Sequence, residues 1–358
     1  MTRHVTVHLK PATVANYRII FDTHCRIRFG ALPPHKLTFS AIAEALVAMK
    51  KTPVAANHMI RRMRSLLRWA ETNRLVVFAN GNPARGHRLY RERPVERILS
   101  VPEIRTFIAR LPEAAMDEAT RTCLMLELLT GQRSGEIAGI RRAHVDLTAA
   151  IWTIPGELNK PGHTHIVPLP PWARSLIADA CARAKGPYLF PSAHGDPAAN
   201  TATPVRAASA TRALGRAQRP VDKEGVPKPR HKDSTWVFDF RDAEDESNPI
   251  CPHDLRRTCS SYLELLGHGD VIRGAILNHS HSRNVTAKHY SSAELLKLKR
   301  SALLDWEAAV RTIMSGADPF STTIEDDRSE ETRKLGLSSD VLTLSPRFEA
   351  KKAEPSVD

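Results

Sequence analysis

Four short clusters of reactive side chains stand out, although they are spread over about 160 residues of the chain. They combine guanidinium groups, which bind anionic oxygens in a bidentate manner, with an amine and imidazoles, which transfer protons, and a phenol, which can act as a nucleophile. Together these groups suit displacement at a charged phosphorus centre. The clusters are Thr130-Gly-Gln-Arg-Ser-Gly-Glu136, Lys160 within Asn159-Lys-Pro-Gly162, His253-Asp-Leu-Arg-Arg-Thr258, and Leu277-Asn-His279 followed by His289-Tyr290.

The chemistry of a phosphodiester explains why these residue types belong together. The diester carries one negative charge, and attack on phosphorus builds more charge on the non-bridging oxygens. Guanidinium groups stay charged at any working pH and can stabilise that charge. The sequence has no carboxylate cluster suited to two-metal catalysis and no Walker motif. It therefore predicts a reaction that needs neither a metal nor any other cofactor.

In this order, the clusters resemble the catalytic signature of the tyrosine recombinase, or phage integrase, family. The match extends to an apolar run that ends at Asp146, a strand–Lys–strand unit that leaves through Val167-Pro-Leu169, and Leu189-Phe-Pro191. Val285-Thr-Ala-Lys-His-Tyr290 is similar to the integrases of genomic islands and satellite phages. The resemblance covers roughly residues 55–315.

The resemblance implies a site-specific DNA recombinase, an integrase that cuts and rejoins DNA through a 3′-phosphotyrosyl intermediate. Tyr290 is the implied nucleophile, and Lys160 is the implied donor of a proton to the 5′-oxygen leaving group. The phosphotyrosyl bond conserves the energy of the phosphodiester, so rejoining needs no ATP. His279 and Tyr290 are eleven residues apart, whereas many members of the family have about nine.

The same resemblance assigns the other catalytic roles. Arg133 and Arg256 would hold the non-bridging oxygens of the scissile phosphate, and His279 would hydrogen-bond that phosphate. His253 would accept or relay the tyrosyl proton. Glu136, one helical turn beyond Arg133, would orient Arg133 or His253 without touching the DNA.

Several of these residues also have ordinary structural explanations. Arg133 and Glu136 could form a surface ion pair three residues apart on a helix. His163 and His165 are interpreted as strand-surface residues rather than catalysts. Tyr262, the other tyrosine near the C-terminal motifs, lies in a regular apolar helical pattern and is expected in the core.

Two other functions fit part of the pattern. A type IB topoisomerase uses the same residue types but relaxes supercoils as a monomer, and a non-catalytic regulator descended from an integrase would bind DNA without cutting it. The complete catalytic set argues against the regulator. Leu296, Leu303 and Val310 are seven residues apart and suit docking on a neighbouring protomer, which favours the recombinase. The helix over 292–315 is therefore expected to join a homotetramer on synapsed DNA, with packing on its own domain as the alternative.

The elements that must position these residues are mostly helical. The predicted fold is mostly α with a small antiparallel β element in an α+β catalytic domain, and the two domains are expected to close on DNA as a clamp. Helices are predicted over 11–29, 38–50, 54–73, 101–111, 115–130, 134–142, 171–184, 253–267, 270–277 and 292–315, with strands at 151–154 and 164–167 around Lys160. The predicted divisions are an N-terminal helical core-DNA-binding domain (1–85), a basic linker (86–99), the catalytic domain (100–315) with an insertion or mobile loop at 191–250, and an acidic, disordered tail (316–358).

The charge of the chain favours double-stranded DNA as the partner. The formal net charge is +13, and because residues 316–358 carry a net −4, the part before them carries +17. The expected DNA-binding residues are four arginines of one predicted helix and one beside the second catalytic arginine: Arg61, Arg62, Arg64, Arg68 and Arg257.

The remaining composition limits the class of protein. The five cysteines form no CxxC pair, so neither a disulfide framework nor a structural zinc site is predicted. No run of about 18 apolar residues and no signal-peptide core occurs. The chain is therefore expected to be cytoplasmic and associated with the nucleoid, without contact to a membrane.

Overall fold

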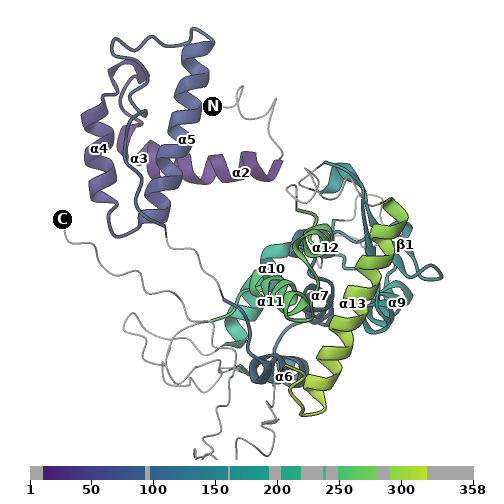
Figure 1. Cartoon of the computed structure of the whole chain (residues 1–358). Helices are drawn as coiled ribbons and strands as arrows, with labels where there is room; N and C mark the ends of the chain where they lie inside the picture. Colours follow the sequence, from purple (N-terminus) through teal and green to yellow (C-terminus); the bar gives the residue numbers. More distant parts are fainter. Residues whose placement is uncertain are drawn as a thin grey trace, which may run out of the picture. The chain divides into compact units, whose positions relative to one another are not determined.

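The computed structural model describes residues 11–92, 97–159, 162–192, 203–218, 237–238, 249–279 and 291–320. The chain forms two compact units, Met1–Val95 and Glu96–Asp358 (Figure 1). Each unit has its own hydrophobic core. In the described part of the chain, every helix is too short or too polar to cross a membrane.

The first unit is a small helical bundle. Its longest helix, α5, begins at a proline, which suits the first helical turn, and buries Met59, Ile60 and Met63 along one face. The helix predicted over 11–29 is interrupted by one π-helical turn. The elements are α2 (Pro11–Ile20), the π-turn η1 (Phe21–Cys25), α3 (Arg26–Phe29), η2 (Pro34–Lys36), α4 (Phe39–Ala48) and α5 (Pro53–Thr72).

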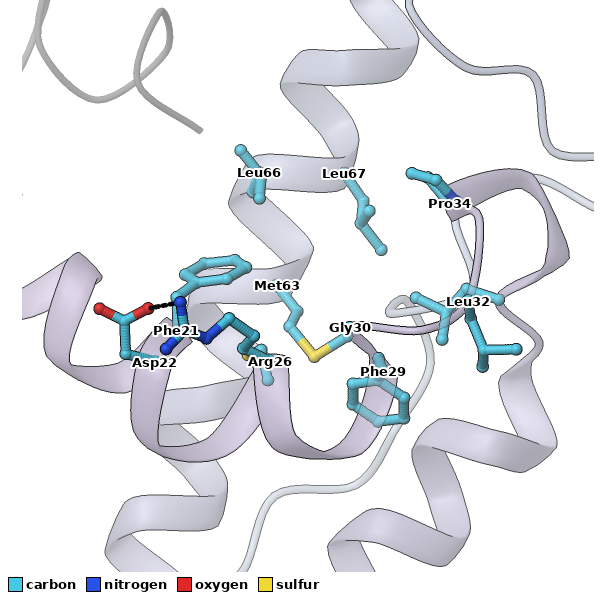
Figure 2. A pocket seen from close by; sticks show the side chains of 12 residues that line it. Phe21, Asp22, Arg26, Phe29, Gly30, Leu32, Pro34, Met63, Leu66 and Leu67 are labelled. Atoms are coloured by element: carbon cyan, nitrogen blue, oxygen red, sulfur yellow. Dashed lines mark ion pairs between the residues drawn. The ribbon is translucent and has the colours of Figure 1, made fainter.

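An apolar pocket of about 310 Å³ lies between the π-turn and α5 (Figure 2). Phe21 and Phe29 line it on one side, and Met63 and Leu67 line it from α5. The only ion pair drawn at its edge joins two exposed side chains of the π-turn and α3, Asp22 and Arg26, across 3.7 Å. Its almost wholly apolar lining distinguishes this pocket from a polar pocket that Arg64 and Arg68 of the same helix line.

The described residues of the stretch predicted as a basic interdomain linker, 86–92 and 97–99, contact one unit or the other. His87 is buried and stacks on Phe39 with ring centroids 3.9 Å apart. The backbone N–H of Tyr90 donates to Asn57 (2.8 Å), and the hydroxyl of Tyr90 donates to the Leu46 carbonyl (2.7 Å). These bonds hold the stretch to the first unit, and the division between the units falls after Val95.

The second unit combines helices with a three-stranded antiparallel sheet, which confirms the predicted mostly helical fold with a small β element. The strand order is β1-β2-β3, and the β2–β3 pair places Trp152 opposite Val167 and Ile154 opposite His165. The elements are α6 (Val101–Arg110), η3 (Leu111–Glu113), α7 (Glu118–Thr130), α8 (Ser134–Ala138), η4 (Arg142–His144), β1 (Val145–Asp146), β2 (Ile151–Ile154), η5 (Gly156–Leu158), β3 (His165–Pro168), α9 (Pro171–Arg183), α10 (Ala207–Ala217), α11 (Pro252–Leu265), α12 (Asp270–Ile276) and α13 (Ser292–Met314).

In its described residues, the stretch predicted to hold an insertion or mobile loop at 191–250 contains a packed helix that was not predicted from the sequence. Helix α10 buries Ala210, Ala213, Leu214 and Ala217, which are spaced three and four residues apart. An alanine stripe gives a weak hydrophobic signal, although it packs well against α7 and α8. Phe238 also reaches the core, where its ring stacks with that of Phe107.

Helix α13 packs on its own domain, so the predicted docking of its apolar stripe on another protomer is wrong. Leu303, Trp306, Val310 and Ile313 are buried in the core of the second unit. The Trp306 indole N–H donates to the Leu128 carbonyl of α7 at 2.8 Å. Figure 1 shows the helix lying along this unit, where it contacts α6, α7, α11, α12 and β3. An apolar stripe on a helix predicts that this face is buried, but it does not predict whether the face packs on its own domain or on another protomer.

The first residues of the predicted tail also belong to the folded unit. Arg105 donates to the carbonyls of Ile313 (2.8 Å) and Ala317 (3.2 Å). The Phe320 ring lies edge-on to Tyr262, with centroids 4.8 Å apart. The boundary predicted at 316 is therefore too early, and the residues beyond 320 lie outside the described part.

Candidate active site

A left-handed turn at the end of α7 places Arg133. Gly131 has φ +65°, and a Cβ there would lie 3.0 Å from Leu277 and 3.2 Å from the Cys259 sulfur, so this position requires glycine. Arg133 follows as the N-cap of α8, and its backbone N–H and its guanidinium both donate to the Glu136 carboxylate, at 3.2 and 3.0 Å. The carboxylate is buried whereas the guanidinium is partly exposed, so Glu136 fixes a cation that still faces solvent.

Arg256 of α11 ties three distant segments together. Its guanidinium is buried and donates to the carbonyls of Gly131 (2.7 Å) and Leu277 (2.6 Å), and it lies 3.2 Å from Nε2 of His279. Burial, and then the nearby Arg133, lower the pKa of Arg256 to about 10, so the group stays protonated at neutral pH. The predicted catalytic residues Arg133, Arg256 and His279 thus gather at one place.

His253 lies in the first turn of α11 with its side chain exposed. Partial burial of its ring, followed by the charges of Arg257 and Arg256, lowers the pKa of His253, and Asp254 opposes these effects. A neutral imidazole can accept a proton, as the predicted role requires. The predicted DNA-binding residue Arg257 forms an ion pair with Asp254 (2.5 Å), which in turn accepts from the Cys251 backbone N–H.

Sequence reasoning missed a set of residues that joins these segments. Gln132 donates to the carbonyls of Thr130 (2.8 Å) and Ile276 (2.9 Å). Nε2 of His165 lies 3.2 Å from the Gln132 carboxamide oxygen and 3.1 Å from the Ile276 carbonyl. Gln132 is completely buried. These bonds link the segment of Arg133 to the sheet and to the end of α12.

The interpretation of His165 as a strand-surface residue is wrong. Its side chain is buried, and burial, followed by the charge of Lys299, lowers its pKa to about 2. The alternation of β3 contained the signal, because His165 points to the same side as the buried Val167. The neighbouring His163 is half-buried and donates to Asn278 at 2.8 Å.

Two of the predicted catalytic residues, Lys160 and Tyr290, lie outside the described residues. Lys160 belongs to a hairpin whose described part is closed by Asn159, which bonds to Gly162 and His163 on the other side. Tyr290 precedes Ser291, the N-cap of α13. Their predicted roles stay predictions.

The arginines of α5 divide into two groups. Arg61 pairs with Glu92 (3.0 Å), and Arg62 lies over the Tyr17 ring (4.6 Å), so both have partners within the first unit. Arg64 and Arg68 line a polar pocket of about 430 Å³, and Arg64 also donates to the Ala84 carbonyl at 3.2 Å. Its other lining residues are Asn82, Arg85, Gly86 and His87, and of these Arg85 and His87 were not singled out from the sequence.

A family model described as the phage integrase family matches residues 97–295. The chain belongs to the phage integrase family. Tyrosine recombinase XerC of Xylella fastidiosa strain 9a5c is 28% identical over 213 residues, an alignment that covers 55% of this chain and 61% of that protein. XerC of strain Temecula1 is 27% identical with the same coverage. The chain thus spans about three-fifths of the length of the curated relatives that it matches.

Solved structures of integrases share the fold. A lambda integrase dimer bound to a COC′ core site has a TM-score of 0.56 and 16% identity, covering 79% of this chain and 92% of that one. A lambda integrase tetramer bound to a Holliday junction has a TM-score of 0.55 and 15% identity, covering 80% and 75%. The Tn1549 transposon integrase in complex with circular intermediate DNA has a TM-score of 0.51 and 16% identity, covering 81% and 92%.

This integrase-family chain carries a buried carboxyl near Arg256 and Ser134. Glu127 of α7 is almost completely buried, and both its oxygens lie within 3.0 Å of the Ser134 hydroxyl. Burial raises the pKa of Glu127 to about 8, although Ser134 and Arg256 act in the opposite direction and Asp254 and Glu136 add to the rise. The folded protein therefore holds a proton at neutral pH that an unfolded glutamate has released.

We expect this proton to make stability depend on pH. Because the folded pKa is raised, the contribution is fully present below the unfolded value near 4.5 and is lost as pH rises to about 8, at up to about 1.4 kcal/mol per pH unit. Glu127→Gln keeps a neutral side chain and removes this dependence. The Tm of the variant should fall less than that of the wild type between pH 5 and 8.5. Glu118→Gln, an exposed site on the same helix, serves as the control; parallel curves for Glu127→Gln and the wild type would contradict the prediction.

Proposed function

We propose that this protein is a site-specific DNA recombinase that cuts and rejoins DNA through a 3′-phosphotyrosyl intermediate. The observation that carries the proposal is the Arg256 guanidinium, which bonds to Gly131, two residues before Arg133, and lies 3.2 Å from His279. The buried Arg256 guanidinium thereby brings the segment that carries Arg133 and the imidazole of His279 together at one site. Such preorganised charge suits the developing negative charge on a phosphate.

In the proposed reaction, the Tyr290 oxygen attacks phosphorus and displaces the 5′-oxygen of the next nucleotide. The phosphotyrosyl bond forms as the phosphorus–oxygen bond to the 5′ side breaks. His253 accepts the tyrosyl proton, and Lys160 donates a proton to the leaving oxygen. Arg133 and Arg256 stabilise the pentacovalent centre. Attack by a free 5′-hydroxyl reverses these steps and joins a new pair of strands.

The proposed partner is double-stranded DNA, bound by a homotetramer that brings two duplexes together. The basic character of the chain and the relative whose structure is a tetramer bound to a Holliday junction support this proposal. Arg64 and Arg68, together with Arg85, are the proposed backbone contacts of the first unit. Because the apolar stripe of α13 is buried in its own domain, the proposed tetramer would assemble through other surfaces.

We further propose that the protein is an integrase of a genomic island or satellite phage, acting on the chromosome within the cell. The segment Val285–Tyr290 supports this subtype. Attachment-site repeats beside a tRNA gene in the flanking DNA are the expected finding, and their absence would contradict this finer assignment.

A nicked suicide substrate carrying the attachment site tests the general proposal. The expected result is a covalent adduct between protein and DNA in the absence of metal and ATP, followed by recombinant product with an intact substrate. Relaxation of supercoiled DNA by isolated monomers, without recombination, would indicate a type IB topoisomerase. Tight binding without any adduct would indicate a non-catalytic regulator.

We expect Lys160→Ala to slow cleavage of an ordinary phosphodiester by about 10²–10⁴-fold, the usual contribution of a general acid. A substrate with sulfur in place of the 5′-bridging oxygen should be cleaved at nearly the wild-type rate, because a thiolate leaves without protonation. Single-turnover rates on both substrates measure the effect. Equal slowing on both would mean that Lys160 acts only in binding.

A further inference from the structure

The end of helix α12 is the point where the segments of the proposed active site meet. The helix closes with Asn278 in the left-handed region (φ +52°), and the His279 backbone N–H donates to the Gly274 carbonyl. The carbonyls of Ile276 and Leu277 are then taken up by side chains from other segments: His165 and Gln132 bind Ile276, and Arg256 binds Leu277.

The hairpin whose sequence contains Lys160 is held to other segments at two places, one at its base and one closer to Lys160. At its base, His165 is buried, and the Lys299 ammonium of α13 donates to the Ile166 carbonyl. Near its tip, His163 donates through Nε2 to the Asn278 carboxamide oxygen at 2.8 Å. The base is part of the core, whereas the second attachment lies three residues after Lys160 and is half-buried.

The residue type at position 278 indicates that its side chain makes a specific contact. Glycine meets a left-handed backbone without steric cost and is the usual residue at this position of a helix end. Asn278 is buried, with an exposed fraction of only 4%. Its only hydrogen bond from the side chain within the described residues is to His163, and its amide nitrogen has no partner there. The carboxamide therefore contributes a contact to the hairpin that the backbone conformation does not demand.

We propose that the His163–Asn278 hydrogen bond is a latch that seats the hairpin of Lys160 on the segment of His279. This inference rests on the proposed function, in which Lys160 is the general acid. Asn278 directly precedes His279, so the latch joins the hairpin whose sequence contains the proposed general acid to the segment of His279. His163 and Asn278 are positioning residues, and neither needs to touch DNA.

The test compares an ordinary suicide substrate with one that carries sulfur at the 5′-bridging position. His163→Ala should slow single-turnover cleavage of the ordinary substrate by about tenfold, because a displaced general acid is used less efficiently. Cleavage of the sulfur substrate should stay within about twofold of the wild-type rate. Asn278→Gly, which keeps the backbone conformation, should behave in the same way.

Three further proteins make the result specific. The double variant His163→Ala/Asn278→Gly should be no slower than either single variant, since both remove the same bond. His163→Gln supplies an amide donor and should recover part of the rate on the ordinary substrate. Thr164→Ala, the exposed neighbour on the same hairpin, should cleave both substrates at the wild-type rate.

The outcomes separate the latch from the function on which it rests. If the sulfur substrate rescues Lys160→Ala but not His163→Ala, the latch is overturned and the general acid stands. Additive rates in the double variant would also overturn the latch. If Lys160→Ala itself is not rescued, Lys160 is not the general acid, and the latch falls with that part of the proposed function.

Discussion

Replacement of Tyr290 by phenylalanine is expected to abolish the covalent protein–DNA adduct while leaving DNA binding unchanged. The phenyl ring fills nearly the same volume, but it has no oxygen with which to form a bond to phosphorus. The measurement is adduct formation on a nicked suicide substrate, together with the binding affinity of the same duplex.

Tyr262 provides the matched control for this experiment. It is buried, it packs against Trp306 with centroids 5.4 Å apart, and burial raises its pKa above the ordinary value. A tyrosine in such a place is a core residue, so Tyr262→Phe should still form the adduct. Persistence of the adduct in Tyr290→Phe and its loss in Tyr262→Phe would move the nucleophile to Tyr262.

Arg256→Lys should reduce the single-turnover cleavage rate by about 10²–10³-fold, even though the charge is kept. The guanidinium donates at once to Gly131 and Leu277 and faces His279, whereas an ammonium is a point donor without the planar fork. The variant should therefore lose the bidentate grip on the phosphate and the alignment of the three segments. At least one buried carbonyl would also lack its partner, at a cost of about 1–3 kcal/mol in the free energy of unfolding.

The neighbouring arginine distinguishes this effect from a general loss of positive charge. Arg257 is paired with Asp254 and is partly exposed, so Arg257→Lys should change the cleavage rate by only a few fold. Cleavage rates measured at saturating protein remove any difference in DNA affinity. Similar losses in the two variants would contradict the assigned role of Arg256.

The sequence alone predicts a large part of this protein, because some physical signals are local. The glycine at 131 ends α7, and the two strands around Lys160 follow from alternation and turn residues. The order of the clusters that contain Arg133 and Arg256 also predicts the family, because it resembles the family's catalytic signature. The family match over 97–295 confirms that prediction.

Other features were decided only by packing between distant segments. The apolar period of α13 predicts burial equally well in its own domain or on a partner, and contact with α7 through Trp306 decides for its own domain. Helix α10 was missed because alanine carries little hydrophobic signal until a neighbour covers it.

The hydrogen bonds at the Ile276 carbonyl show most clearly what the sequence determines and what only the tertiary structure decides. His165 and Gln132 meet at the Ile276 carbonyl, although they are 111 and 144 residues from it along the chain. The sequence determined which groups could carry the chemistry, because side-chain type fixes which atoms can donate a proton, accept one or attack phosphorus. Only the tertiary structure decided which of them share hydrogen bonds, because the partner of a buried polar group is whichever residue the fold brings within about 3 Å of it.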